Sequence, residues 1–267
     1  MFYCFSLRLP TSALAIRTTT VNERVERLVS KGYTVIALDY CIDASKIKQN
    51  PPSWPTIECD QLSCTQQPVQ ILKRLTIRVD SPADLPKLSD YAEIADILAI
   101  EPYSEKGLTF AIQAYREIDI LSIGPYTQNF KSTFGLMKTA EQSGIVLEFH
   151  TSHLMDFEIK SRASYLAKIY QFLRTSRNRN FILSWGDDNG TDCLEPYEAC
   201  SYMQQFMKVS AKRSMEALTT NGTVVMRRSK ARRAKLYSYY LDDKSETEPW
   251  KIYTPFSNEG VVKKRKE

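Results

Sequence analysis

The residues of this sequence that could do chemistry are acidic side chains and imidazoles at the ends of apolar runs. Asp39, Glu101 and His150 each end or follow such a run, and the chain has only 2 histidines, of which His153 is the second. Carboxylates and imidazoles that converge on two cations are the equipment of a metal-dependent phosphoesterase. That hypothesis would use as ligands Asp39, Glu101, His150, His153 and Asp187.

The same residues have a simpler interpretation. The two histidines lie close together on one short segment, and the first apolar run contains no HxH pair that could complete a metal site. Acidic residues at strand ends also commonly stabilise the first turn of the helix that follows. We therefore keep the metal-dependent phosphoesterase as the alternative, and we expect no metal, no cofactor and no catalytic residue in this chain.

No motif of nucleophilic or nucleotide-binding enzymes is present. The sequence contains neither a GxSxG nucleophile elbow nor a GxxxxGK[ST] phosphate loop. The 6 cysteines form no CxxC pair, so we expect reduced thiols in an intracellular protein and not a zinc site. No apolar run approaches the ~18 residues of a membrane span, and the first residues lack the pattern of a signal peptide. These absences favour a binding protein over an enzyme.

Positive charge is the remaining chemical signal. The net charge is +5, which permits an acidic partner, and 6 lysines and arginines lie within residues 227–235. Tyrosines follow at 237, 239 and 240. Cations that pair with phosphates, next to rings that stack on bases, are typical of an RNA-binding segment. A solvated tail or a nuclear-localisation signal would have the same composition, so these alternatives stay open.

The elements that must position these residues alternate regularly along the chain. Apolar runs typical of strands are followed by segments with helical periodicity about seven times, which predicts parallel βα units with right-handed crossovers. The expected strands are 2–9, 34–39, 67–79, 95–100, 118–123, 145–149 and 181–185. The expected helices are 22–32, 82–91, 108–116, 131–143, 162–175, 196–207 and 211–220.

A closed barrel fits this pattern better than an open sheet. The first strand is not followed by a glycine-rich turn, and the number of units is close to that of a TIM barrel. No eighth strand is evident, so we expect a distorted TIM-like (β/α) barrel over residues 1–222. Asn221 and Gly222 are expected to end the last helix, and residues 223–267 to form a basic C-terminal extension. In such a barrel, functional residues lie at the C-terminal ends of the strands.

The strand at 67–79 organises the rest of the chain. Its sequence QPVQILKRLTIRV alternates apolar residues with polar or basic ones in its second half, and Asp80, Ser81 and Pro82 then end it. Its basic residues are Lys73, Arg74 and Arg78. Such long side chains either extend their charged ends to water or bind an acidic partner.

Four segments together resemble the p30 protein subunit family of nuclear ribonuclease P and ribonuclease MRP. They are QPVQILKRLTIRV (67–79), DILAIEPYSEKGLTFA (96–111), DILSI (119–123) and SGIVLEFH (143–150). The resemblance covers about residues 20–222. One departure is that the family's first strand carries an acidic residue near its start, whereas FYCFSLRL (2–9) has none.

The resemblance implies an α/β barrel related to the polymerase-and-histidinol-phosphatase fold, without its metal ligands. It implies a noncatalytic subunit of the ribonuclease P ribonucleoprotein, an endoribonuclease whose RNA component matures the 5′ ends of precursor tRNA with Mg²⁺. Membership of RNase MRP, and with it rRNA processing, is also expected.

The partners that the resemblance implies are RNase P RNA, RNase MRP RNA, precursor tRNA, a small ferredoxin-like RNase P protein subunit and other RNase P proteins. The expected location is the nucleus or nucleolus, with no membrane contact. Phosphate contacts, which position RNA without reading its sequence, are expected at Lys73, Arg74, Arg78, Lys106, Lys131, Arg227, Arg228, Lys230, Arg232 and Arg233.

Overall fold

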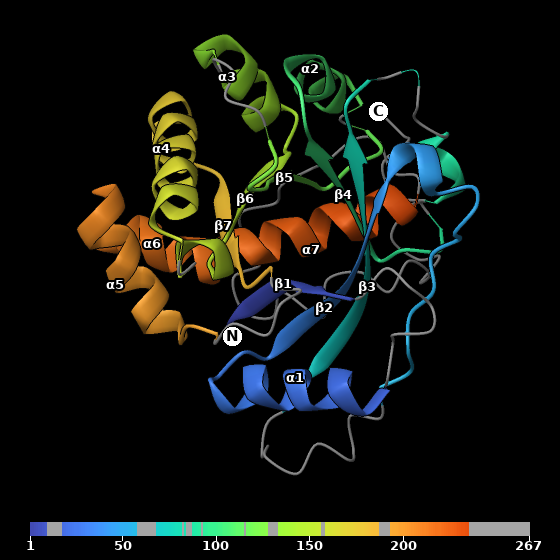
Figure 1. The fold of residues 1–267 in the computed structure, drawn as a ribbon, viewed down its shortest axis with the longest axis horizontal. Coiled ribbons are helices and arrows are strands. Elements are labelled where there is room, and N and C mark those ends of the chain that lie inside the picture. Colours follow the sequence, from blue (N-terminus) through green and yellow to red (C-terminus); the bar gives the residue numbers. More distant parts are fainter. Residues whose placement is uncertain are drawn as a thin grey trace, which may run out of the picture.

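Seven parallel strands, in sequential order, form one sheet in the described part of the chain (Figure 1). The computed structural model describes residues 1–9, 18–57, 68–81, 83, 87–91, 93–114, 116–127, 133–155, 158–186 and 193–234. The strands are β1 (Tyr3–Arg8), β2 (Val35–Asp43), β3 (Gln70–Val79), β4 (Ile97–Pro102), β5 (Ile120–Ile123), β6 (Val146–His150) and β7 (Phe181–Ser184). Each strand pairs in parallel with the next.

The sheet nearly closes on itself where β1 meets β7. The described residues of these two strands form no ladder, but the N–H of Phe5 donates to Ser184 Oγ at 3.2 Å and that of Gly186 donates to the Ser6 carbonyl at 2.7 Å. Gly186 has φ +72°, and a Cβ there would lie 2.3 Å from the His150 ring. Only glycine fits this turn. The expected distorted TIM-like barrel is therefore confirmed.

Helices surround the strands, which is why most of the strands are buried along their whole length. Every residue of β1, β4, β5, β6 and β7 is buried. The helices are α1 (Thr18–Ser30), α2 (Glu105–Gln113), α3 (Phe134–Gln142), α4 (Ile159–Thr175), α5 (Pro196–Met207), α6 (Ala211–Leu218) and α7 (Thr220–Arg233). None of these described helices has the length and apolar character needed to cross a bilayer.

Hydroxyl side chains mark where the crossover helices begin. Ser104 accepts from the N–H of Gly107 at the start of α2, and Thr133 accepts from the N–H of Leu136 at the start of α3. Each satisfies a backbone donor that the first turn of a helix leaves unpaired.

Two expected elements differ in the structure. β2 continues to Asp43, beyond the predicted end at residue 39, because its full length pairs with β3. The described residues within 82–91 form a 3-10 turn at Leu88–Asp90 and no α-helix. Pro86 lies inside that predicted helix, and proline removes a helical hydrogen bond.

The predicted helix end at Asn221 and Gly222 is wrong. The chain turns earlier, after α6, and α7 runs from Thr220 to Arg233 across the expected boundary between residues 222 and 223. A Cβ on Gly222 would lie 2.4 Å from the ring of Tyr3. This glycine therefore lets α7 approach the sheet closely and does not end a helix. The remainder of the expected extension, 235–267, lies outside the described residues.

Helix α7 closes the end of the barrel where the strands begin (Figure 1). Val225 of α7 packs in an apolar layer inside the barrel with Tyr3, Phe5 and residues of the other strands. A separate, larger apolar cluster lies between the sheet and the outer helices. The barrel interior is thus filled at one end, and its other half is left for polar side chains.

Candidate functional site

Polar side chains occupy the interior above the apolar layer. On β2, Val35 and Ala37 belong to the apolar layer, and Asp39 begins the polar layer two residues later. On β6, Val146 is followed in the same way by Glu148. Alternate residues of a strand share one face, so the period-two pattern places these side chains inside the barrel at the carboxyl half of the strands.

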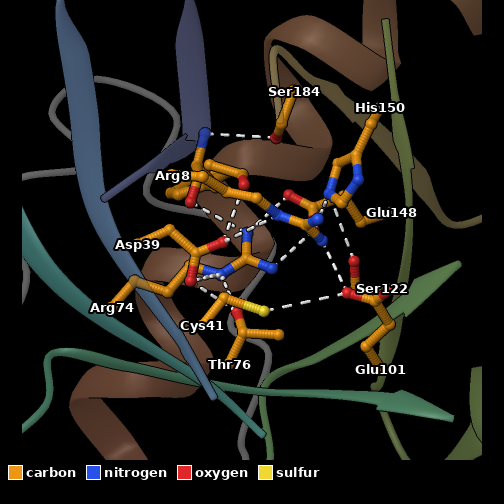
Figure 2. A network of polar contacts seen from close by, with 12 residues as sticks. Arg8, Asp39, Cys41, Arg74, Thr76, Glu101, Ser122, Glu148, His150 and Ser184 are labelled. Atoms are coloured by element: carbon orange, nitrogen blue, oxygen red, sulfur yellow. Dashed lines mark hydrogen bonds and ion pairs between the residues drawn. The ribbon is translucent and has the colours of Figure 1, made fainter. Parts of the chain in front are cut away.

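Arg74 lies at the centre of this polar layer (Figure 2). It is fully buried, and its two terminal nitrogens donate to the two carboxylate oxygens of Glu148, each at 2.6 Å. One of these nitrogens also donates to the Phe5 carbonyl at 2.8 Å, and its Nε donates to Thr76 at 2.9 Å. Every side of the guanidinium is therefore engaged by β1, β3 or β6.

A second arginine enters the interior from β1. Arg8 is 1% exposed, and its guanidinium donates to Glu101 of β4 at 2.5 Å. Arg78 approaches the same Glu101 oxygen at 3.7 Å from the rim of the barrel, where its side chain is 16% exposed. Glu101 thus faces two arginines (Figure 2 shows Arg8 and Glu101). A Cβ at Gly124 would lie 1.9 Å from the Glu101 carboxylate, so the missing side chain makes room for this pair.

Asp39 is held by hydroxyl groups. Ser6 donates to one of its oxygens at 2.7 Å, and Thr76 donates to the other at 2.5 Å. The Nε of Arg74 lies 3.4 Å from the same carboxylate, and that of Arg8 lies at 4.0 Å. Three carboxylates, Asp39, Glu101 and Glu148, therefore face two buried arginines, Arg8 and Arg74, and the partly exposed Arg78.

The arginines keep Glu101 and Glu148 ionised in spite of their burial. Burial by itself raises the pKa of Glu148, but the charge of Arg74 and a hydrogen bond from His150 outweigh it and hold that pKa well below its usual value. Burial likewise opposes ionisation of Glu101, and Arg8 and Arg78 lower its pKa. A guanidinium beside a carboxylate favours the charged form of that carboxylate, so Glu101 and Glu148 form lasting ion pairs with these arginines.

The donor set does not fit a metal centre. Both oxygens of Glu148 and both of Asp39 already accept hydrogen bonds from protein groups. Among the described residues, no group of three or more His, Cys, Asp and Glu side chains is arranged to hold a metal ion. The arginines carry the positive charge that divalent ions would supply in a metal-dependent phosphoesterase. Asp187, a ligand of that alternative, lies outside the described residues.

The histidines stand beside this network. His150 Nε2 lies 3.2 Å from both Glu148 and Ser122, and its ring is 5.9 Å from that of His153. Burial, followed by the neighbouring His150, lowers the pKa of His153 to about 3. His153 is therefore neutral in the folded protein at physiological pH, which suits a packing residue better than a cationic RNA contact.

The expected RNA contacts separate into interior and surface groups. Arg74, Arg228 and Arg232 are buried, which withdraws them from any surface that a phosphate could reach. Lys73, Lys106 and Arg233 are exposed, whereas Arg78, Arg227 and Lys230 are partly buried. Lys131 lies outside the described residues.

The two buried arginines of α7 anchor that helix to the start of the strands. Arg228 donates to the carbonyls of Ile118 at 2.8 Å and Ser143 at 2.5 Å. Arg232 forms an ion pair of 2.9 Å with the buried Asp119 and donates to the Asp96 carbonyl at 3.0 Å. Two of the five cations in the apparent RNA-binding cluster at 227–233 therefore serve to close the barrel.

Sequence reasoning missed Arg8 as an interior residue. The available signal was its place in the first strand, where the resembled family carries an acidic residue and this strand has none. A basic residue in a strand that is otherwise wholly buried needs a carboxylate partner. That partner, Glu101, is 93 residues away in the chain, so only the fold brings the two together.

The fold and interior define a class: α/β barrels in which arginine–carboxylate pairs fill the place of a catalytic centre. The chain matches over residues 7–234 the sequence model of the family described as RNase P subunit p30. It belongs to this family, and the match includes α7.

Curated relatives agree with this family. The chain is 27% identical over 202 residues to "Probable ribonuclease P protein subunit 3" of Schizosaccharomyces pombe, covering 74% of this chain and 81% of that protein. It is 24% identical over 196 residues to "Ribonuclease P/MRP protein subunit RPP1" of Saccharomyces cerevisiae, covering 69% of this chain and 66% of that protein, so it spans slightly less than two thirds of the latter.

Solved structures share the fold at low identity. A chain from the cryo-EM structure of archaeal ribonuclease P with mature tRNA superposes with a TM-score of 0.60 and 16% identity, over 85% of this chain and 96% of that chain. Aspergillus niger ochratoxinase superposes with a TM-score of 0.50 and 11% identity, over 84% of this chain and 71% of that chain. At such identities the likeness describes the barrel alone.

Proposed function

We propose that this chain is a noncatalytic protein subunit of ribonuclease P, shared with ribonuclease MRP, that supports 5′ maturation of precursor tRNA. The observation that carries the proposal is the family match over residues 7–234, which runs from the end of β1 through α7. The named relatives are subunits of ribonuclease P or of both enzymes. Catalysis then resides in the RNA component of the ribonucleoprotein, which uses Mg²⁺. A role in ribonuclease MRP would also involve the chain in rRNA processing.

The geometry supports a structural role for the interior. A phosphoesterase needs carboxylates that are free to bind cations or to move protons. Here Glu148 is held by two hydrogen bonds from Arg74, and Glu101 by Arg8. Asp39, Glu101 and Glu148, the described carboxylates of this network, are all buried. We therefore assign the barrel the role of a rigid body that presents its outer surface to partners.

That outer surface supplies the contacts with RNA. The exposed or partly buried cations from the expected set are Lys73, Arg78, Lys106, Arg227, Lys230 and Arg233. We assign to them the neutralisation of phosphates on RNase P RNA and RNase MRP RNA. The further partners that we propose are precursor tRNA, a small ferredoxin-like protein subunit and other RNase P proteins. The complex would work in the nucleus or nucleolus.

The first experiment is a pull-down of the tagged chain from its own cells, with sequencing of the recovered RNA. We expect a structured RNA enriched over a tag-only control, and an eluate that cleaves the 5′ leader from precursor tRNA in the presence of Mg²⁺. Recovery of no RNA by a correctly folded chain would contradict the proposal.

A second experiment addresses the phosphoesterase alternative. The purified chain, free of RNA, should cleave neither RNA nor phosphate esters in Mg²⁺ or Mn²⁺, because its carboxylates are engaged by arginines. Robust cleavage that is lost in both Glu101→Gln and His150→Ala would favour the phosphoesterase and overturn the noncatalytic role.

A further inference from the structure

A hollow of about 170 Å³ lies between α3 and the turn that follows α4. Phe134 and Lys138 of α3 line one side of it, and Arg177 and Arg179 of the turn line the other. The two helices lie next to one another on the outside of the barrel (Figure 1). None of these four residues is among the contacts expected from the sequence, and they have no part in the interior ion pairs.

The turn that shapes the hollow has an unusual backbone. Arg177, Asn178 and Asn180 all have positive φ, at 56°, 56° and 54°. Asparagine tolerates this left-handed region, but arginine enters it at a cost in free energy, and such residues cluster at functional sites. The turn is held in place because the N–H of Asn178 donates to the Leu173 carbonyl at 2.8 Å and the side chain of Asn180 donates to the Ile145 carbonyl at 2.5 Å.

This backbone places an arginine over an aromatic ring. The guanidinium of Arg177 lies 4.5 Å from the centroid of the Phe134 ring, and Phe134 is 46% exposed. A large ring that stays exposed at a cation-lined hollow is available to a planar ligand. Guanidinium and aromatic planes are the surfaces on which unpaired RNA bases stack.

The lining is positively charged. Lys138, Arg177 and Arg179 are exposed, and among the described residues none of them has a carboxylate within 4.0 Å. Among the described residues of the lining, Glu141 is the one that is acidic. A volume of about 170 Å³ is below the ~300 Å³ of typical small-molecule pockets, so the hollow suits a phosphate and a partly inserted base.

The hollow lies at the end of the barrel that α7 closes. Ile145 and Asn180 stand directly before β6 and β7, at the start of these strands. The neighbouring Ser143 carbonyl accepts from Arg228 of α7. The basic residues Arg227 and Lys230 are on the same helix. This end of the barrel is opposite the carboxyl end, where barrel enzymes hold their active sites.

We propose that this hollow binds an unpaired segment of RNA, with Lys138 and Arg179 pairing with its phosphates and the Phe134–Arg177 pair stacking on one base. The inference rests on the proposed function, because it locates the surface through which the subunit would contact its RNA. The role assigned to this site is to position the RNA, not to cleave it.

The test uses the full chain and a fluorescein-labelled 12-nucleotide polyuridine RNA in salt titrations followed by anisotropy. The double variant Lys138→Gln/Arg179→Gln should bind at least tenfold more weakly, and its slope of log affinity against log salt should be smaller by about 1.4, since a single-stranded phosphate contact contributes ~0.7. Phe134→Leu should weaken binding about fivefold to 100-fold with an unchanged slope, because it removes stacking and no charge.

The matched control is Lys160→Gln/Lys212→Gln, which removes two exposed lysines outside the lining of the hollow. This control should bind the RNA with an affinity within about twofold of that of the unchanged chain, because surface substitutions away from a site have small effects. Equal losses in both double variants would overturn the site by making the effect one of net charge. Binding of a polyglutamate peptide in place of polyuridine would assign the hollow to an acidic protein and would also overturn the proposal.

Ultraviolet crosslinking of the tagged chain in its own cells separates this inference from the proposed function. Crosslinks should map to the peptides that contain Phe134 or Arg177. This experiment uses the unchanged chain, so its outcome does not depend on the folding of a variant. Recovered RNA with crosslinks confined to other peptides would overturn the hollow alone. Recovery of no RNA at all would overturn the proposed function together with it.

Discussion

Arg74 of β3 and Glu148 of β6 face one another across the barrel interior and share two hydrogen bonds, each 2.6 Å from nitrogen to oxygen. Both side chains are fully buried. A buried pair of this kind adds little net stability compared with a well-packed apolar pair, but loss of one member leaves an uncompensated charge in a medium of low polarity. The pair therefore makes the fold depend on both residues together.

Arg74→Met should lower the free energy of unfolding by about 3–5 kcal/mol, because Glu148 would keep its charge and lose its partner. Urea denaturation of the two proteins at pH 7 measures the difference. The double variant Arg74→Met/Glu148→Leu should recover a large part of the loss. A single variant within ~1 kcal/mol of the unchanged chain would contradict the account of the interior.

Stability should depend on pH through His153. Its pKa is about 3 in the folded chain and near 6.5 when unfolded, so the unfolded chain binds the extra proton between these values. The contribution is fully present above pH 6.5 and is lost progressively as the pH falls towards 3. Urea denaturation in steps from pH 7.5 to 4.5 should show a decline that is weaker in His153→Gln. Identical pH profiles for both proteins would contradict this assignment.

A second decline should begin only at lower pH. Because the folded pKa of Glu148 is depressed, its contribution is present above its unfolded value of 4.5 and is lost as the pH falls through the folded value. The decline attributed to His153 therefore has to be measured above pH 4.5, where Glu148 is ionised in both states.

Arg232→Met should destabilise the fold by about 3 kcal/mol, since it leaves the buried Asp119 with a weaker partner, Arg228, at 3.9 Å. Arg227→Met removes the same charge from a partly buried position on the same helix and should change stability by less than ~0.5 kcal/mol. Thermal and urea unfolding of the two variants measure the contrast. Equal effects would mean that α7 does not close the barrel through Arg232.

Two glycines in helices should respond in opposite directions to alanine. At Gly222 the added carbon would lie 2.4 Å from the Tyr3 ring, so Gly222→Ala should cost about 1–3 kcal/mol through overpacking. At Gly135 of α3 nothing lies within 4 Å of the added carbon, and Gly135→Ala should stabilise the chain by up to ~1 kcal/mol. A neutral Gly222→Ala variant would show that α7 does not pack closely on β1.

The architecture was accessible from the sequence because it follows from local patterns. Alternating strand and helix signals predicted seven parallel units and a distorted barrel, as the structure has them. The segments around residues 67–79 and 143–150 indicated the family, to which the chain belongs. The end of the last helix was missed, because Gly222 is a common helix-ending residue and here serves a close contact with Tyr3.

The roles of the basic residues were decided by the tertiary structure alone. Periodicity tells that Arg74 and Lys73 point to opposite faces of β3, but not which face becomes the closed interior. The carboxylates that neutralise Arg74, Arg8 and Arg232 lie 74, 93 and 113 residues away in the chain. Burial and charge pairing at such separations depend on closure of the barrel, so the sequence by itself determined the barrel and its family, and the fold decided which cations are left for a partner.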